Sequence, residues 1–189
     1  MRLLNETDPS FRISDDFFLP GTFILDVVTT YGYEPLVASP EWVSGNLRIW
    51  DGPPWESESN VIVTARQSPI DTSFSGVYRV FNTEPLTSTE RPIFVITWDF
   101  DLMTLQPATS PVVLTEGEYW IDWQVIGGAS GWANPVMEPG ATPTTPITVI
   151  DNGRQLRPAG WTPTGGVGRE IPFVVEATLE GVFSNSFES

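Results

Sequence analysis

Four segments of this chain alternate apolar and polar residues with a period of two, and this pattern constrains the fold more than any other feature. Successive side chains of a β-strand point to opposite faces, so strict alternation indicates a strand with one buried and one solvated face. Such strands are typical of antiparallel sheets. The segments are residues 22–33, 93–102, 118–125 and 171–179.

The alternation assigns the large apolar side chains of these segments to a core and their polar neighbours, such as Asp122 and Gln124, to solvent. Trp98 and Trp123 lie on the predicted inner face, as large aromatic core residues. The full set of expected inward residues is Phe23, Leu25, Val27, Tyr31, Tyr33, Phe94, Ile96, Trp98, Phe100, Leu102, Tyr119, Ile121, Trp123, Val125, Ile171, Phe173, Val175, Ala177 and Leu179.

Shorter apolar runs supply further strand candidates, and turn residues separate them. The chain has 18 prolines and 16 glycines, which suit many tight turns and few helices. No window has a convincing helical period. We therefore predict an all-β fold, a single antiparallel, jelly-roll-like β-sandwich of about eight or nine strands with little helix. The shorter candidates are residues 46–50, 61–65, 77–81, 111–114 and 147–150.

The length of 189 residues suits one domain. Two stretches rich in proline and glycine, residues 137–146 and 157–169, read as loops too short to separate two cores. We expect one β-sandwich domain over residues 1–189, with an N-terminal arm at 1–13 and a C-terminal tail at 181–189.

The charge is strongly acidic. Nine basic residues, all arginine, stand against 24 acidic ones, for a net charge of −15. Such a chain repels phosphate backbones and anionic membranes, so we expect no nucleic-acid partner. No apolar run approaches the roughly 18 residues of a membrane span, so we expect no membrane insertion. The acidity favours a role in solubility, and a cation-dependent surface is the alternative.

Cysteine and histidine are both absent. Their absence excludes thiol nucleophiles, disulfides, Ser-His-Asp relays and the usual zinc or copper sites. Acidic pairs such as Asp99 with Asp101, or Glu118 with Asp122, could be written as acid–base pairs. The favoured interpretation is that they are solvated side chains, and the sequence predicts no enzyme.

We expect no cofactor; the alternative is a structural calcium ion, because calcium takes oxygen ligands and needs no histidine. Asp15 and Asp16, before the first strongly alternating segment, are the candidate ligands. No calcium-loop motif supports them.

Eight tryptophans suggest carbohydrate binding, because the apolar faces of sugars stack on indole rings. Trp42, Trp55, Trp132 and Trp161 occupy segments rich in turn residues, where binding surfaces are commonly built. We nominate these four as ligand-binding residues; the alternative is that they cover the ends of the sandwich. Trp50 and Trp120 have the opposite parity to the predicted core and could be exposed or lie under a second layer.

Five motifs are spread over nearly the whole chain: Ser14–Pro20, Thr30–Tyr33, Leu47–Pro54, Gly117–Trp123 and Ile171–Phe173. Together they resemble a group of jelly-roll-like domains in secreted and cell-surface bacterial proteins. The resemblance implies export and no known catalysis, and it carries over no active-site residue.

The C-terminal residues 182–189 resemble the Phe-x-x-Gly-Phe-Glu tail of exported gammaproteobacterial proteins, with Ser186 where glycine is usual. The start of the chain lacks the apolar core of a signal peptide. Export would therefore imply a mature form or a domain of a longer chain.

These observations predict a non-catalytic binding or adhesion domain that is secreted, either extracellular or on the cell surface, with glycan the favoured ligand and a surface or assembly protein the other partner. The alternative is a structural subunit of a surface layer, an extracellular filament or a virion, because a β-sandwich offers strand edges for self-assembly.

Overall fold

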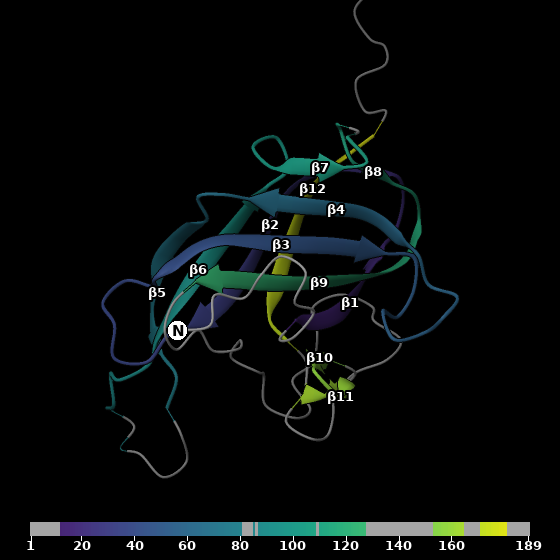
Figure 1. Ribbon diagram of the computed structural model, residues 1–189. Coiled ribbons are helices and arrows are strands. Elements are labelled where there is room, and N and C mark those ends of the chain that lie inside the picture. Colours follow the sequence, from purple (N-terminus) through teal and green to yellow (C-terminus); the bar gives the residue numbers. More distant parts are fainter. Residues whose placement is uncertain are drawn as a thin grey trace, which may run out of the picture.

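Two antiparallel β-sheets pack face to face in the computed structural model of the chain (Figure 1). The structure describes residues 12–80, 85, 87–108, 110–127, 153–164 and 171–180. The seven-stranded sheet lies in front in Figure 1, and the strands of the five-stranded sheet run steeply across it from behind. This architecture confirms the predicted antiparallel β-sandwich.

The seven-stranded sheet has the order β11-β10-β1-β9-β3-β4-β7. Its members are β1 (Ile13–Leu19), β3 (Trp42–Trp50), β4 (Val61–Gln67), β7 (Thr104–Gln106), β9 (Gly117–Gly127), β10 (Arg154–Arg157) and β11 (Gly160–Pro163). The five-stranded sheet has the order β12-β2-β6-β5, and β8 pairs with β2 beside that path. Its members are β2 (Phe23–Tyr33), β5 (Asp71–Tyr78), β6 (Pro92–Asp99), β8 (Val113–Leu114) and β12 (Phe173–Leu179).

The described residues form 12 strands, more than the eight or nine expected. Strands β1, β7, β10 and β11 were not predicted. Strand β1 has no alternation to detect because both of its faces are buried. The candidate at 77–81 overlaps only the end of β5, and 147–150 lies outside the described residues. None of the described helical structure is long and apolar enough to cross a membrane.

The predicted boundary of the N-terminal arm was too late. Arg12 and Ile13 are already buried, and Ile13 begins β1. The rest of the arm, residues 1–11, and the predicted tail at 181–189 lie outside the described residues.

The core between the sheets is centred on Trp98, which is fully buried. Its Nε1–H donates a 2.8 Å hydrogen bond to the hydroxyl of Thr30 on the neighbouring strand β2. Trp123 is also buried and lies in the same cluster, so both tryptophans are core residues as predicted. The bond to Thr30 satisfies the only polar group of Trp98, which would otherwise be costly to bury.

The predicted inner face of β2 was wrong in the middle of the strand, although Tyr33 at its end is buried as expected. The pairing with β12 shifts register at Asp26, so that Leu25 and Val28, three apart, both enter the core. This β-bulge reverses the parity of the later residues of β2, because one extra residue exchanges the two faces of a strand. Val27 and Tyr31, expected inside, are therefore only partly buried.

Two other predicted core residues lie at strand ends and are exposed. Leu102 is 77% exposed because β6 ends at Asp99 and a turn comes after it. Leu179 ends β12 and is also exposed.

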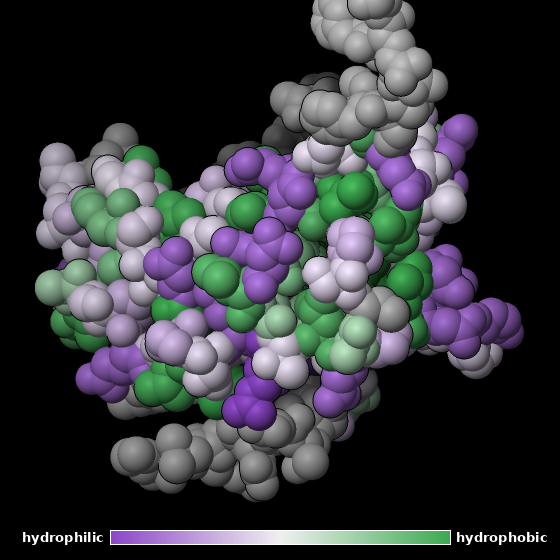
Figure 2. Space-filling model, turned by 90° about the horizontal axis from the view of Figure 1, so that it is seen from above, coloured by the Kyte–Doolittle hydropathy of each residue, from purple (hydrophilic) through white to green (hydrophobic). Residues whose placement is uncertain are grey.

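Figure 2, which views the molecule from above, shows apolar and polar side chains intermingled on that side of the molecule.

Replacing Gly45 with alanine should destabilise the fold by about 1–3 kcal/mol or more through overpacking. A Cβ at this position in β3 would lie 2.4 Å from the ring of Trp98 and 2.9 Å from the backbone oxygen of Gln124. Gly117→Ala is the matched control, since its nearest atom would be 3.6 Å away. Urea unfolding measures both variants, and equal losses would contradict the packing described around Trp98.

Candidate functional site

The outer face of the seven-stranded sheet gathers four tryptophans, which we call the tryptophan cluster: Trp50, Trp55, Trp120 and Trp161. Trp50 and Trp120 are directly opposite each other in the pairing of β3 with β9. Their neighbours Ile49 and Ile121 are fully buried in the core, so the two indoles point away from it.

Three of the four indoles, those of Trp120, Trp55 and Trp161, form a continuous row, and Trp50 lies opposite Trp120 in the strand pairing. The ring of Trp55, from the loop between β3 and β4, lies edge-on to that of Trp120 with centroids 4.6 Å apart. The ring of Trp161, from β11, lies 6.0 Å from Trp55 at an interplanar angle of 62°. Edge-to-face packing at these distances stabilises aromatic pairs. Trp120 is buried, and the other three remain partly exposed.

The structure brings together two of the four nominated tryptophans, Trp55 and Trp161. Trp42 lies apart from them: it begins β3 rather than lying in a loop, is 6% exposed, and packs edge-on against Phe94 in the core. Trp132 lies outside the described residues. The remaining members, Trp50 and Trp120, were not nominated, although their parity opposite to the core was the signal that pointed to them.

A buried ion pair lies beside the tryptophan cluster on the same face. The Arg12 guanidinium donates to one carboxylate oxygen of Asp122, and Trp50 Nε1–H donates to the other at 2.6 Å. Arg12 also donates to the side-chain oxygen of Gln124 at 3.3 Å and to the backbone oxygen of Asn46 at 3.4 Å. The pair therefore joins the segment before β1 to both β9 and β3.

Asp122 and Gln124 point outward as predicted, but the expectation that they are solvated was wrong. Asp122 is 0% exposed and Gln124 is 3% exposed. Arg12, placed in the predicted arm, supplies the charge and the donors that allow both to be buried. Burial lowers the pKa of the Arg12 guanidinium, and the negative charge of Asp122 opposes that shift.

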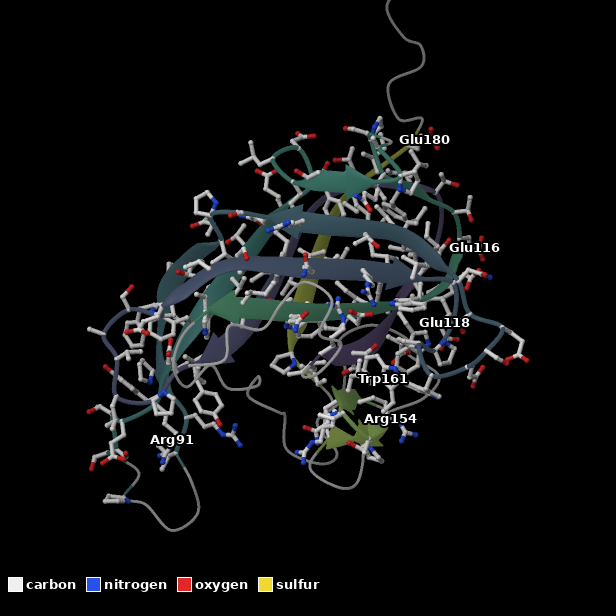
Figure 3. The ribbon with its side chains drawn as sticks, viewed as in Figure 1. Arg91, Glu116, Glu118, Arg154, Trp161 and Glu180 are labelled. Carbon is white, nitrogen blue, oxygen red and sulfur yellow. The ribbon has the colours of Figure 1, made fainter. Side chains whose placement is uncertain are left out.

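Arg154 adds a cation to the tryptophan cluster. It belongs to β10, is paired with Ser14 of β1, and places its guanidinium carbon 4.9 Å from the centroid of the Trp55 ring. This is a cation–π distance. Figure 3 shows Arg154 and Trp161 close together at the β10–β11 hairpin.

The candidate calcium ligands are placed differently from the prediction. Asp15 and Asp16 do precede the first strongly alternating segment, but they lie within a strand of their own, β1, and both are buried. Adjacent strand residues point to opposite faces, so the two carboxylates do not converge on one ion. Asp15 accepts hydrogen bonds from the backbone N–H of Asp16 at 3.1 Å and of Ile171 at 2.6 Å, and so ties β1 to the segment that leads into β12.

Within the described ranges no three acidic side chains gather in a group that could hold a metal ion. Calcium binding stays a prediction. The geometry gives Asp15 a structural role, because its carboxylate accepts hydrogen bonds from two buried backbone N–H groups.

No family model, curated protein or solved structure matches this chain. The candidate site is therefore defined by its own geometry: the tryptophan cluster, a buried ion pair beside it and an arginine stacked on Trp55.

Removing one partner of the buried ion pair should destabilise the protein strongly. Asp122→Asn leaves the Arg12 charge buried without its counter-ion, a loss of about 3–5 kcal/mol. Arg12→Met combined with Asp122→Leu should lose clearly less than the summed losses of Arg12→Met alone and Asp122→Leu alone, because the double variant leaves no buried charge behind.

Denaturant unfolding of the single and double variants measures this coupling. The pair of Arg91 with Glu90, whose side chains are 17% and 60% exposed and whose closest atoms are 4.0 Å apart, is the control and should contribute far less than the buried pair, about 1 kcal/mol at most. Additive effects at Arg12 and Asp122 would contradict the ion pair.

Proposed function

We propose that the chain is a non-catalytic, extracellular binding or adhesion domain whose tryptophan cluster binds glycan. The observation that carries this proposal is the convergence of Trp50, Trp55 and Trp161 on one sheet face, each with part of its surface exposed. Partly exposed indoles held in place by neighbours offer apolar area at little entropic cost, and sugar C–H faces stack on such rings.

The buried polar network supports the rigidity that a binding surface needs. Asp122 fixes the Trp50 indole through its Nε1–H, and Trp55 is held between the rings of Trp120 and Trp161. A preorganised site loses less conformational entropy when it binds. A few polar groups beside the apolar area orient the ligand, and Arg154 provides such groups.

The hydrogen bonds of Asp122, the carboxylate that contacts the tryptophan cluster through Trp50, support the absence of catalysis. Both of its oxygens accept hydrogen bonds, one from Arg12 and one from Trp50. A glycosidase acid must instead carry a proton and give it to the leaving oxygen. An extracellular or cell-surface location is proposed on the sequence resemblance to secreted bacterial domains.

A second candidate function is that of a structural subunit, favoured by edge strand β5. Phe74, Val77 and Tyr78 on this strand are 46%, 55% and 39% exposed. Exposed apolar groups on an edge strand can pair with a second copy of the chain. The bulge between Phe74 and Tyr78 weakens such pairing, because it interrupts the row of hydrogen-bonding groups. Light scattering on the purified chain separates the two functions, since a monomer at high concentration would reject the subunit.

Replacing Trp161 with alanine should weaken glycan binding at least tenfold, because tryptophan is among the residues that contribute most to binding energies. The cost to stability should be about 1–2 kcal/mol, below the roughly 3–5 kcal/mol of Trp123→Ala in the core. A glycan array identifies ligands, and calorimetry on the best of them measures the loss.

Phe74→Ala is the matched control, as an exposed aromatic residue on the edge of the other sheet. It should leave glycan affinity unchanged. Equal affinity of the wild-type and Trp161→Ala proteins would reject the tryptophan cluster as the binding site.

A further inference from the structure

We propose that the ligand is an anionic glycan, carrying carboxylate or sulfate groups, and that Arg154 recognises its charge. This inference rests on the proposed function and goes further by naming the ligand chemistry. It is drawn from the distribution of charge over the two sheets and from the surroundings of the Arg154 guanidinium.

Positive charge is concentrated on the seven-stranded sheet of a chain whose net charge is −15. Most arginines in the described ranges lie on its strands or directly adjoin them, and only Arg79 and Arg91 lie elsewhere. The arginines of this sheet are Arg12, Arg48, Arg66, Arg154 and Arg157.

The carboxylates on the strands of the same sheet are mostly withdrawn from the surface. Asp15, Asp16 and Asp122 are at most 1% exposed, which leaves Glu118 as the exposed carboxylate on the described strands of this sheet. Arg48, Arg66 and Arg154 lie on the outer face, whereas Arg157, three residues from Arg154 along β10, points to the other side. An anion that approaches the outer face therefore meets these three guanidinium groups and the exposed carboxylate of Glu118.

The arginines of this sheet differ in whether they already have a hydrogen-bond partner. Arg12 is committed to Asp122, and Arg157 donates a 3.2 Å hydrogen bond to the side chain of Gln155. Arg154 stacks on Trp55, yet its Nε–H is buried and has no hydrogen-bond partner among the described residues. A buried donor without a partner is costly. A ligand would reach the guanidinium through its terminal nitrogens, because Arg154 as a whole is partly exposed.

Arginine suits this task because its planar fork donates two parallel hydrogen bonds to one oxyanion group. Stacking on Trp55 holds the guanidinium plane beside the indole row. A sugar ring on the partly exposed indoles would therefore place an acidic substituent within reach of the fork. Recognition would combine apolar stacking with one charge-assisted contact.

Two glutamates of the neighbouring loop act against an anionic ligand. Glu56 and Glu58 lie in the loop that carries Trp55. Their repulsion, together with the net charge of −15, lowers the affinity for long polyanions, and screening at physiological salt limits this effect to about 8 Å. Short oligosaccharides at physiological salt are therefore the appropriate ligands.

Calorimetry with tetragalacturonate and its fully methyl-esterified form tests the inference, because the two ligands share one sugar skeleton and differ in charge. Sulfated oligosaccharides of similar length form the third arm. The wild-type protein should bind at least one of the two anionic ligands tenfold or more tightly than the neutral ester, and the arm that binds identifies the acidic group.

Arg154→Gln should lower the affinity for the anionic ligand to that for the neutral ester and so abolish this preference. Arg91→Gln, which removes one positive charge elsewhere, should keep the preference and so controls for net charge. Glu56→Gln with Glu58→Gln should strengthen binding of the anionic ligand. Thermal unfolding of each variant verifies that its fold is intact.

Equal binding of the acid, ester and sulfated ligands by the wild-type protein, with loss of all three in Trp161→Ala, would overturn the inference and leave the proposed function standing. A preference that survives Arg154→Gln would overturn the role of Arg154. Failure of all charged and neutral glycans to bind would overturn both proposals.

Discussion

Arg12 and Asp122 are paired on the side of the seven-stranded sheet that faces away from the core, yet both are almost completely buried. Burying two charges is expensive unless hydrogen bonds satisfy them. Here Gln124, the Asn46 backbone and Trp50 complete the network. The sandwich thus has a polar layer outside its apolar core.

This layer determines what the outer face can do. Asp122 holds the Trp50 indole in place through a hydrogen bond, and Trp50 lies opposite Trp120, so one buried carboxylate helps to position the tryptophan cluster. Trp55 and Trp161 extend that cluster from a loop and from the β10–β11 hairpin. A binding surface assembled from a loop and separate strands needs such fixed points, since each segment would otherwise move independently.

The sequence predicted the apolar core well and the polar layer poorly, for one physical reason. Period-2 alternation reports which face a residue is on, so Trp98 and Trp123 were assigned correctly. It does not report what covers the other face, so Asp122 was expected in solvent. The partner that covers it, Arg12, is 110 residues away in sequence, and only the β1–β9 pairing brings them together. The β2 bulge is likewise set by pairing with β12, which residues 22–33 alone do not reveal.

The central claim is that the outer face of the seven-stranded sheet, and not the core or the edge strands, receives the ligand. Fluorine NMR of protein labelled with 5-fluorotryptophan tests it directly, since each of the eight tryptophans gives its own signal. Titration with a bound glycan should shift the signals of Trp50, Trp55 and Trp161 and leave those of Trp98 and Trp123 in place. Shifts confined to other tryptophans, with the signals of the cluster unchanged at saturation, would contradict the account.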